Sequence, residues 1–132
     1  MTKKLSSAFI LITGIVILSN CFWSSRFKEM KTVRAMPIEA VDLASVQDGA
    51  FKGDFSYGGF TYEVAVAVKD HRIETIDILK NRDTKHAKQA EGVIPKVISA
   101  QTVNVDVVTG ATTTSKALLK AIENALRKGT AK

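Results

Sequence analysis

The sequence has few of the side chains from which most catalytic and metal sites are built. Its 132 residues include one cysteine and two histidines, His71 and His86. One cysteine excludes an internal disulfide framework and a cysteine-rich metal site, and two histidines are too few for a multi-histidine centre. No constellation of cysteine, histidine and carboxylate residues stands out along the chain. We therefore expect no resident metal ion and no catalytic group of the chain's own.

The folded part of the chain also has almost no net charge. Residues 1–34 hold six basic residues and one acidic residue, whereas residues 35–132 hold 13 basic and 12 acidic residues. The first segment therefore carries +5 and the remainder +1 of the formal net charge of +6. Nucleic-acid-binding domains typically carry a basic patch within the folded part. The distribution thus argues against DNA or RNA as a partner.

Charge and proline are both absent from residues 5–23, LSSAFILITGIVILSNCFW. As a helix, these 19 residues would span about 28 Å, which is enough for the hydrocarbon core of a bilayer. Lys3 and Lys4 precede the run and favour a cytoplasmic N-terminus with export of everything that follows. The run predicts a membrane anchor or signal within residues 1–25, a linker over 26–47 and a folded domain over 48–132.

Two other interpretations of the first segment stay open. Leu18-Ser19-Asn20-Cys21 resembles a lipobox, in which Cys21 would carry lipid and become the new N-terminus. A plain cleaved signal peptide is the third interpretation. All three place the domain outside the cytoplasm, and the uncleaved single-pass anchor in the cell membrane is the one that we favour.

Beyond the linker, the pattern of apolar residues predicts antiparallel strands. Alternation is most regular at residues 60–69, where Tyr62, Val64, Val66 and Val68 share one face. Apolar residues are spaced less regularly in the strand that follows, which allows a β-bulge. The predicted strands cover residues 49–56, 60–69 and 72–80, with turns at Tyr57-Gly58-Gly59 and Asp70-His71.

The apolar pattern then changes to the period of helices. The predicted helices cover residues 84–91, 93–100 and 113–128, with a short extended segment at 103–108. Gly92 ends the first helix, and Gly129 is expected as the C-cap of the last. Strands followed by helices indicate the α+β class: a small antiparallel sheet covered by helices on one face, preceded by one N-terminal transmembrane helix or a lipoprotein signal.

Residues 106–115, DVVTGATTTS, lead from the extended segment into the last helix. Gly110 and Ala111 leave room for a ligand to approach the backbone. The first N–H groups of a helix lack intrahelical partners and carry partial positive charge, so the pattern predicts an anion site, with phosphate as the usual occupant and Lys116 as an added cation. A plain hydroxyl-rich helix cap has the same composition. The hydroxyls belong to Thr109, Thr112, Thr113, Thr114 and Ser115.

Asp106-x-x-Thr109-Gly110-Ala111-Thr112 resembles the flavinylation motif of the FMN-binding domain family. That family includes flavin subunits of ion-pumping NADH:quinone reductases and small membrane-tethered flavoproteins. The resemblance implies that the hydroxyl of Thr112 carries FMN through a phosphoester bond, installed by a flavin transferase that uses FAD and a divalent metal such as Mg²⁺. It implies that the transferase needs Asp106, and that Thr109, Gly110 and Ala111 form the turn beneath the phosphate. Thr113 is the adjoining cofactor-binding residue.

The resemblance extends to residues 45–128, with Asp48–Gly53 as the opening strand. It implies an electron carrier with covalent FMN in a membrane-associated redox chain, or a subunit of an oxidoreductase, rather than a stand-alone enzyme. The alternative is a non-redox binding module with the same fold that holds FMN weakly or not at all. A third hypothesis is a membrane-surface adaptor that acts through the basic residues beside the anchor on anionic lipid.

The remaining polar and aromatic residues have ordinary interpretations. We expect His71 in a turn and His86 on a solvated helix face. For the aromatic residues beside the Gly58-Gly59 turn, core packing and flavin contact both stay open; these are Tyr57, Phe60 and Tyr62. A solvated basic face is expected from Lys80, Arg82, Lys85 and Lys88.

Overall fold

The computed structural model describes residues 25–130 of the chain. The predicted membrane segment, its alternative as a lipoprotein signal and Cys21 fall within residues 1–24, and so they lie outside the described residues. Within residues 25–130, no helix combines the length and the apolar character needed to cross a bilayer.

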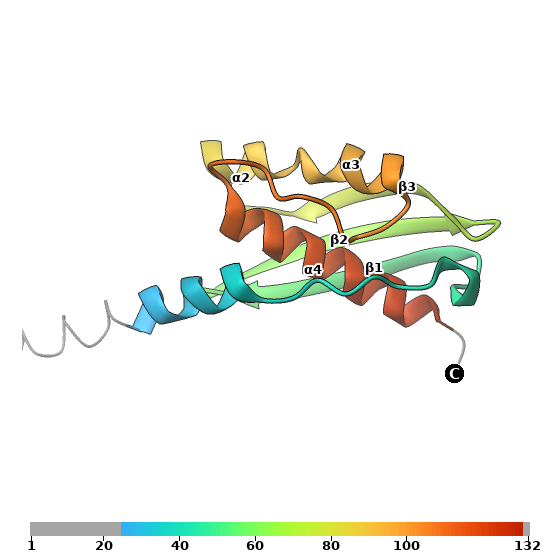
Figure 1. The fold of residues 1–132 in the computed structure, drawn as a ribbon, viewed down its shortest axis with the longest axis horizontal. Coiled ribbons are helices and arrows are strands. Elements are labelled where there is room, and N and C mark those ends of the chain that lie inside the picture. Colours follow the sequence, from blue (N-terminus) through green and yellow to red (C-terminus); the bar gives the residue numbers. More distant parts are fainter. Residues whose placement is uncertain (1–24, 131–132) are drawn as a thin grey trace, which may run out of the picture.

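The three predicted strands form one antiparallel sheet in the order β1-β2-β3 (Figure 1). They are β1 (Gly49–Tyr57), β2 (Phe60–Lys69) and β3 (Arg72–Lys80). Both connections are two-residue turns whose central residues have positive φ, which suits the right-handed twist of a hairpin. The β2–β3 register shifts between Glu63 and Val64 and again between Ala67 and Val68, which confirms the predicted bulge.

Helices cover one face of this sheet, so the α+β class is confirmed. Figure 1 shows α4 running along the sheet, with α2 and α3 at its β3 side. Residues 103–108, predicted as extended, form no strand. Besides a helical segment at residues 25–35, the helices are η1 (Leu43–Ser45, a 3-10 turn), α2 (Lys85–Ala90), α3 (Val93–Ala100) and α4 (Thr112–Gly129).

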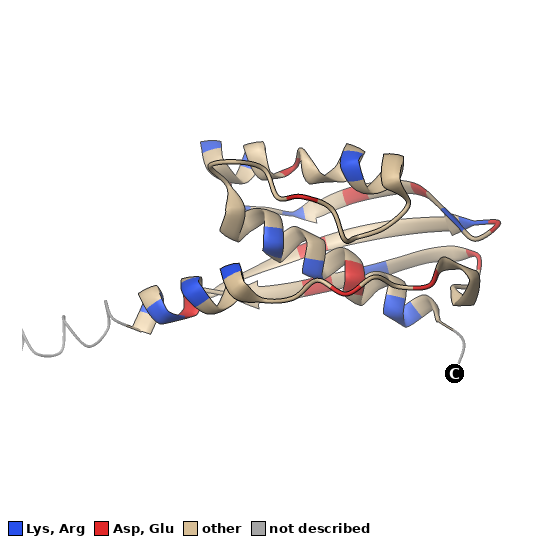
Figure 2. Ribbon diagram, viewed as in Figure 1, with Lys and Arg blue, Asp and Glu red and all other residues tan. Residues whose placement is uncertain are grey.

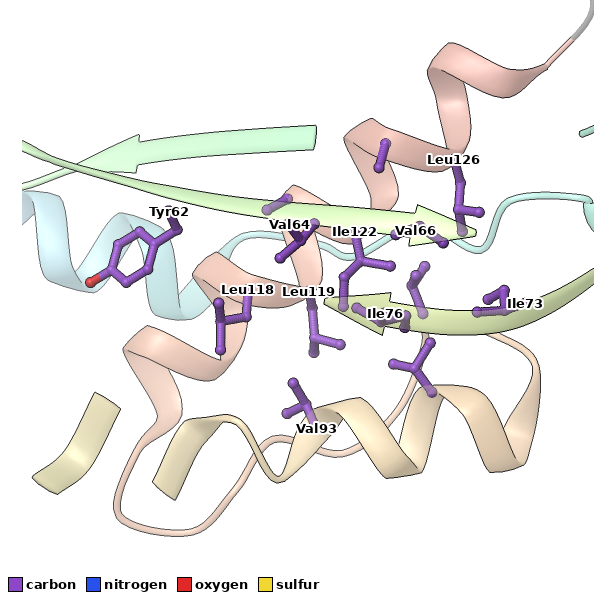
Figure 3. Packing of buried hydrophobic residues seen from close by; sticks show 14 of the residues in the cluster. Tyr62, Val64, Val66, Ile73, Ile76, Val93, Leu118, Leu119, Ile122 and Leu126 are labelled. Atoms are coloured by element: carbon purple, nitrogen blue, oxygen red, sulfur yellow. The ribbon is translucent and has the colours of Figure 1, made fainter. Parts of the chain in front are cut away.

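The core lies between β2 and α4 (Figure 3). The alternating face of β2 is buried as predicted, because its apolar residues meet the apolar stripe of α4. Each large aliphatic side chain that is fully buried contributes about 1.5–3 kcal/mol to stability. The largest contributors from the two elements are Val64, Val66, Leu118, Leu119, Ile122 and Leu126.

Two glycines allow α4 to lie directly on β1. A Cβ on Gly53 would overlap the carbonyl oxygen of Ala121 and the amide nitrogen of Ala125. A Cβ on Gly129 would sit 2.6 Å from the Phe51 ring. Gly129 is thus required for close packing against Phe51. It is the last residue of α4 and not the predicted C-cap, which is Thr130 instead. These contacts fix where α4 lies along the sheet.

A buried carboxylate ties the segment before η1 to α4. Glu123 is 1% exposed and accepts hydrogen bonds from Lys120 Nζ (3.0 Å), Arg127 Nε (2.9 Å) and the backbone N–H of Glu39 (3.2 Å). Burial alone would raise the pKa of Glu123, but these hydrogen bonds favour the charged form and hold its pKa below the usual value.

The close approach at Gly53 predicts a large loss of stability in the Gly53→Ala variant. We expect a loss of about 3 kcal/mol, because the added methyl group forces α4 away from β1. Urea unfolding followed by circular dichroism measures this loss. The matched control is Asp54→Ala, an exposed neighbour on the same strand, which should stay within about 0.5 kcal/mol of the wild type. Equal stability of the two variants would contradict the close packing.

The depressed pKa of Glu123 predicts a specific pH dependence of stability. Its contribution is fully present above the pKa of a glutamate in the unfolded chain and is lost as the pH falls through the lower, folded-state pKa. Glu123→Gln should cost about 3 kcal/mol at neutral pH, because it breaks a buried charge cluster. The variant should also lose less stability than the wild type on acidification.

Chemical unfolding at several pH values tests this prediction, with exposed Glu74→Gln as the control. An equal loss of unfolding free energy on acidification in the wild type and the Glu123→Gln variant would count against it.

Candidate functional site

One hollow of the described chain lies at the N-terminus of α4. It has a volume of about 410 Å³. Four of the predicted site residues line it: Gly110, Ala111, Thr112 and Thr113. The other lining residues are Met30, Arg34, Tyr57, Arg82, Thr84, His86 and Thr114. The walls therefore come from the helical segment 25–35, the ends of β1 and β3, the start of α2 and the start of α4.

The backbone before α4 closes tightly onto the helix. Gly110 has a φ of +82°, a conformation that glycine adopts without strain. The N–H of Ala111 donates to the carbonyl of Val108 (3.0 Å), and the N–H of Val108 donates to Ser115 Oγ (3.2 Å). No side chain caps the first turn of α4. Its first amides are therefore available to an anion at the positive end of the helix dipole.

The three consecutive threonines at this helix start have different surroundings. Thr113 is 7% exposed, and its Oγ1 accepts a hydrogen bond from Arg34 Nε at 2.8 Å. The Thr114 hydroxyl lies beside the Tyr62 phenol. Thr112 is half-exposed, and its hydroxyl makes no hydrogen bond within residues 25–130. The hydroxyl of Thr113 is therefore engaged, whereas Thr112 and Thr114 both border the hollow.

Arg82 and Tyr57 form an aromatic wall of the hollow, and the Phe60 and Tyr62 rings pack behind them. The Arg82 guanidinium lies 5.4 Å from the Tyr57 ring centroid and 5.2 Å from that of Phe60, within the range of cation–π attraction. The Tyr57 and Tyr62 rings stack with centroids 5.4 Å apart. Tyr57 thus lines the hollow, whereas Tyr62 belongs to the core.

Two polar atoms near this wall lack partners. Within residues 25–130, Tyr62 Oη and Arg82 Nε are buried and make no hydrogen bond. In Figure 3 the Tyr62 hydroxyl points away from the aliphatic core. A buried polar group without a partner costs about 1–3 kcal/mol, so such groups commonly mark a water or ligand position.

The phenol of Tyr62 stays protonated at neutral pH. Burial raises the pKa of Tyr62, and its neighbour Tyr57 raises it further, whereas Arg82 and Thr114 oppose the shift. A protonated phenol can donate a hydrogen bond, and Arg82 Nε can only donate. The Tyr62 hydroxyl and Arg82 Nε are therefore two hydrogen-bond donors near the hollow without a partner in the described residues.

Asp106 and Thr109 stand apart from the other predicted site residues. Asp106 is exposed and lines a separate hollow with Lys96, whose Nζ donates to the backbone carbonyl of Asp106 (3.3 Å). Thr109 is exposed and does not line the 410 Å³ hollow. Lys116, expected as an added cation, turns away from the hollow and donates to the carbonyl of Met36 (3.1 Å).

The sequence interpretation missed several lining residues. Arg82 is half-buried against aromatic rings, so its expected place on a solvated face is wrong. His86 is exposed as expected, yet it also lines the hollow. Met30 and Arg34 come from the predicted linker. Their spacing of four residues, which places them on one face of a helix, is the signal that could have identified them.

Comparison with known proteins places the site in a family. The sequence model of the FMN-binding domain family matches residues 57–127. A protein of Treponema pallidum (strain Nichols), described as "Uncharacterized protein", is 31% identical over 86 residues. The match covers 64% of this chain and 24% of the relative, so this chain spans about a quarter of that protein's length.

The family match includes the structural features that surround the hollow. It begins at Tyr57 in the wall, contains Arg82 and the whole turn before α4, and ends near the close of that helix. It covers more than half of the chain. The chain therefore belongs to the FMN-binding domain family, and FMN is its cofactor.

Proposed function

We propose that this protein is a membrane-anchored, extracytoplasmic carrier of covalently attached FMN that passes electrons in a membrane-associated redox chain. The family supports the flavin, and the charge-free run at residues 5–23 after Lys3 and Lys4 supports the anchor and the export of the domain. Bound FMN supplies the redox chemistry by taking up and releasing one or two electrons, while the protein provides position and electrostatics.

The residues around the hollow fit FMN. Uncapped amides at the start of α4 suit its phosphate, and the open backbone at Gly110 allows the phosphate to come close. Tyr57 and Arg82 offer a flat, partly apolar wall with unused donor capacity, which suits a planar heterocycle with carbonyl and nitrogen acceptors. These residues would hold the phosphate and the ring system, respectively.

The observation that carries covalent attachment is the unengaged hydroxyl of Thr112. Thr113 is buried and hydrogen-bonded to Arg34, and Thr114 faces the Tyr62 phenol. Thr112 lines the hollow, and its hydroxyl makes no hydrogen bond within the described residues. Thr114 also lines the hollow, so the helix start excludes Thr113 and the motif resemblance assigns the acceptor to Thr112.

The family resemblance implies FAD as the donor in the attachment step. Thr112 Oγ1 bonds to the phosphorus of the FMN half of FAD. The bond from that phosphorus to the bridging oxygen of the pyrophosphate breaks, and AMP leaves with the bonding electron pair. The threonine proton is released to solvent. The step involves no oxidation or reduction. It therefore needs FAD, a flavin transferase and its divalent metal, and no oxidant or reductant.

Asp106 fits a contact with that transferase. It is exposed, lies outside the 410 Å³ hollow and belongs to the same connection as Thr112. A separate enzyme that binds the exposed connection before α4 would contact Asp106. Covalent attachment also suits the proposed location, because FMN released outside the cell membrane is lost by dilution, and a small domain has little core with which to enclose a ligand.

The first prediction of this proposal concerns the acceptor. Full-length protein produced with a flavin transferase should carry the mass of an FMN-phosphoryl group on the peptide that contains Thr112. Thr112→Ala should abolish that mass and the flavin fluorescence of the denatured band, because the hydroxyl is the attacking group. Thr112→Ser, which restores a hydroxyl, should retain both.

The control for hydroxyl loss elsewhere is Thr75→Val, at an exposed position on β3, which should be labelled like the wild type. A flavin that survives denaturation of the Thr112→Ala variant would place the bond on another residue. A wild-type chain that never acquires covalent flavin would favour the binding-module alternative.

The second prediction concerns the membrane. We expect the full chain in the membrane fraction, with its domain digested by protease added to intact spheroplasts, because Lys3 and Lys4 direct export. Intact-mass measurement of the membrane-extracted protein separates the two anchors, because a transmembrane anchor should keep its full length without lipid, whereas a lipoprotein should begin at a lipidated Cys21. Protection of the domain from added protease would contradict the proposed orientation.

A further inference from the structure

The helical segment 25–35 lies outside the family-matched region, yet it builds one side of the hollow. We propose that Arg34 in this segment binds the phosphate of the FMN held at Thr112. This inference rests on the proposed function and adds a phosphate-binding residue from outside the matched domain.

The segment is held in place at several points. Glu29 Oε1 accepts a hydrogen bond from the backbone N–H of Gly58 in the β1–β2 turn (2.9 Å). Val33 is 4% exposed and is therefore packed against the domain. Just beyond the segment, the carbonyl of Met36 accepts a hydrogen bond from Lys116 on α4 (3.1 Å). The position of Arg34 is therefore set by contacts on both sides of it.

The guanidinium of Arg34 retains unused donors beside the acceptor residue. Its Nε donates to Thr113 Oγ1 at 2.8 Å, which places the side chain next to Thr112 in the chain. Its Nη groups make no hydrogen bond or ion pair within residues 25–130, and Arg34 lines the same hollow as Thr112. An arginine fork presents paired N–H groups that match two oxygens of a phosphate.

The charge of the hollow agrees with this assignment. Two arginines line it and no carboxylate does. Among the charged residues of the helical segment 25–35, Figure 2 shows a predominance of Lys and Arg over Asp and Glu. The phosphodiester at Thr112 bears one negative charge, which the helix start and Arg34 would both stabilise. Arg34 is thus assigned to the phosphate, whereas Arg82 stands at the aromatic wall.

A comparison of FMN with riboflavin tests the assignment, because riboflavin has the same ring system and lacks the phosphate. The full-length Thr112→Ala variant cannot attach flavin covalently, so flavin fluorescence quenching with this variant measures the dissociation constants of FMN and riboflavin. Adding Arg34→Gln should weaken FMN binding about tenfold, equivalent to about 1.4 kcal/mol, and leave riboflavin binding unchanged. Adding Arg34→Lys should recover part of the loss.

The matched control is Lys31→Gln, an exposed cation on the same helical segment that does not line the hollow. It should leave both dissociation constants unchanged. This result would show that the effect of Arg34→Gln comes from a specific contact and not from the loss of one positive charge. Equal FMN binding with and without Arg34 would overturn the assignment, and so would an equal loss of FMN and riboflavin binding.

A second measurement uses the covalently loaded protein. The ³¹P resonance of the phosphodiester should shift in the Arg34→Gln variant and stay in place in the Lys31→Gln variant. An unchanged resonance in Arg34→Gln would overturn the assignment even if attachment is normal. Failure of the wild-type chain to acquire any flavin would instead overturn the proposed function, so the two failures are distinguishable.

Discussion

The contact between α4 and the backbone of β1 is the constraint on which the rest of the structure depends. Because Gly53 has no side chain, the helix backbone at Ala121 and Ala125 rests directly on the strand. This contact fixes the height of α4 above the sheet and its position along it. The N-terminus of α4 is thereby brought to the end of the sheet where β1 turns into β2, beside Tyr57 and Arg82. The position of the candidate site is therefore a consequence of core packing.

Much of the fold could be predicted because its signals are local. The alternation in β2 and the apolar stripe of α4 each predict that one face of the element is buried. Both faces are buried as predicted. Gly129 shows where such reasoning ends. A glycine near a helix end is typical of a C-cap, but here it is required by the ring of Phe51, a residue far away in the sequence. Local patterns carry no information about such a partner.

The site could be predicted only in part, for the same reason. The turn at Gly110 and the hydroxyls that follow it are contiguous, so the sequence identified them together. Arg82 and Arg34 reach the hollow through the folding of β3 and of the segment before η1; Arg82 has no local motif, and Arg34 has only its four-residue spacing from Met30. Basic residues in a polar stretch usually face solvent, but Arg82 is half-buried against two aromatic rings, whereas the other basic residues of the stretch are exposed.

The attachment of the helical segment 25–35 to the β1–β2 turn and to α4 has a mechanical consequence. A helix joined firmly to a domain acts as a stiff stalk, and each residue in it adds about 1.5 Å of height and about 100° of rotation. In the proposed membrane-anchored form, the number of residues between the hollow and the bilayer would set the direction in which the hollow faces. A flexible tether would let the domain tumble, whereas a rigid helical segment would hold a flavin in the hollow at a fixed angle to the membrane.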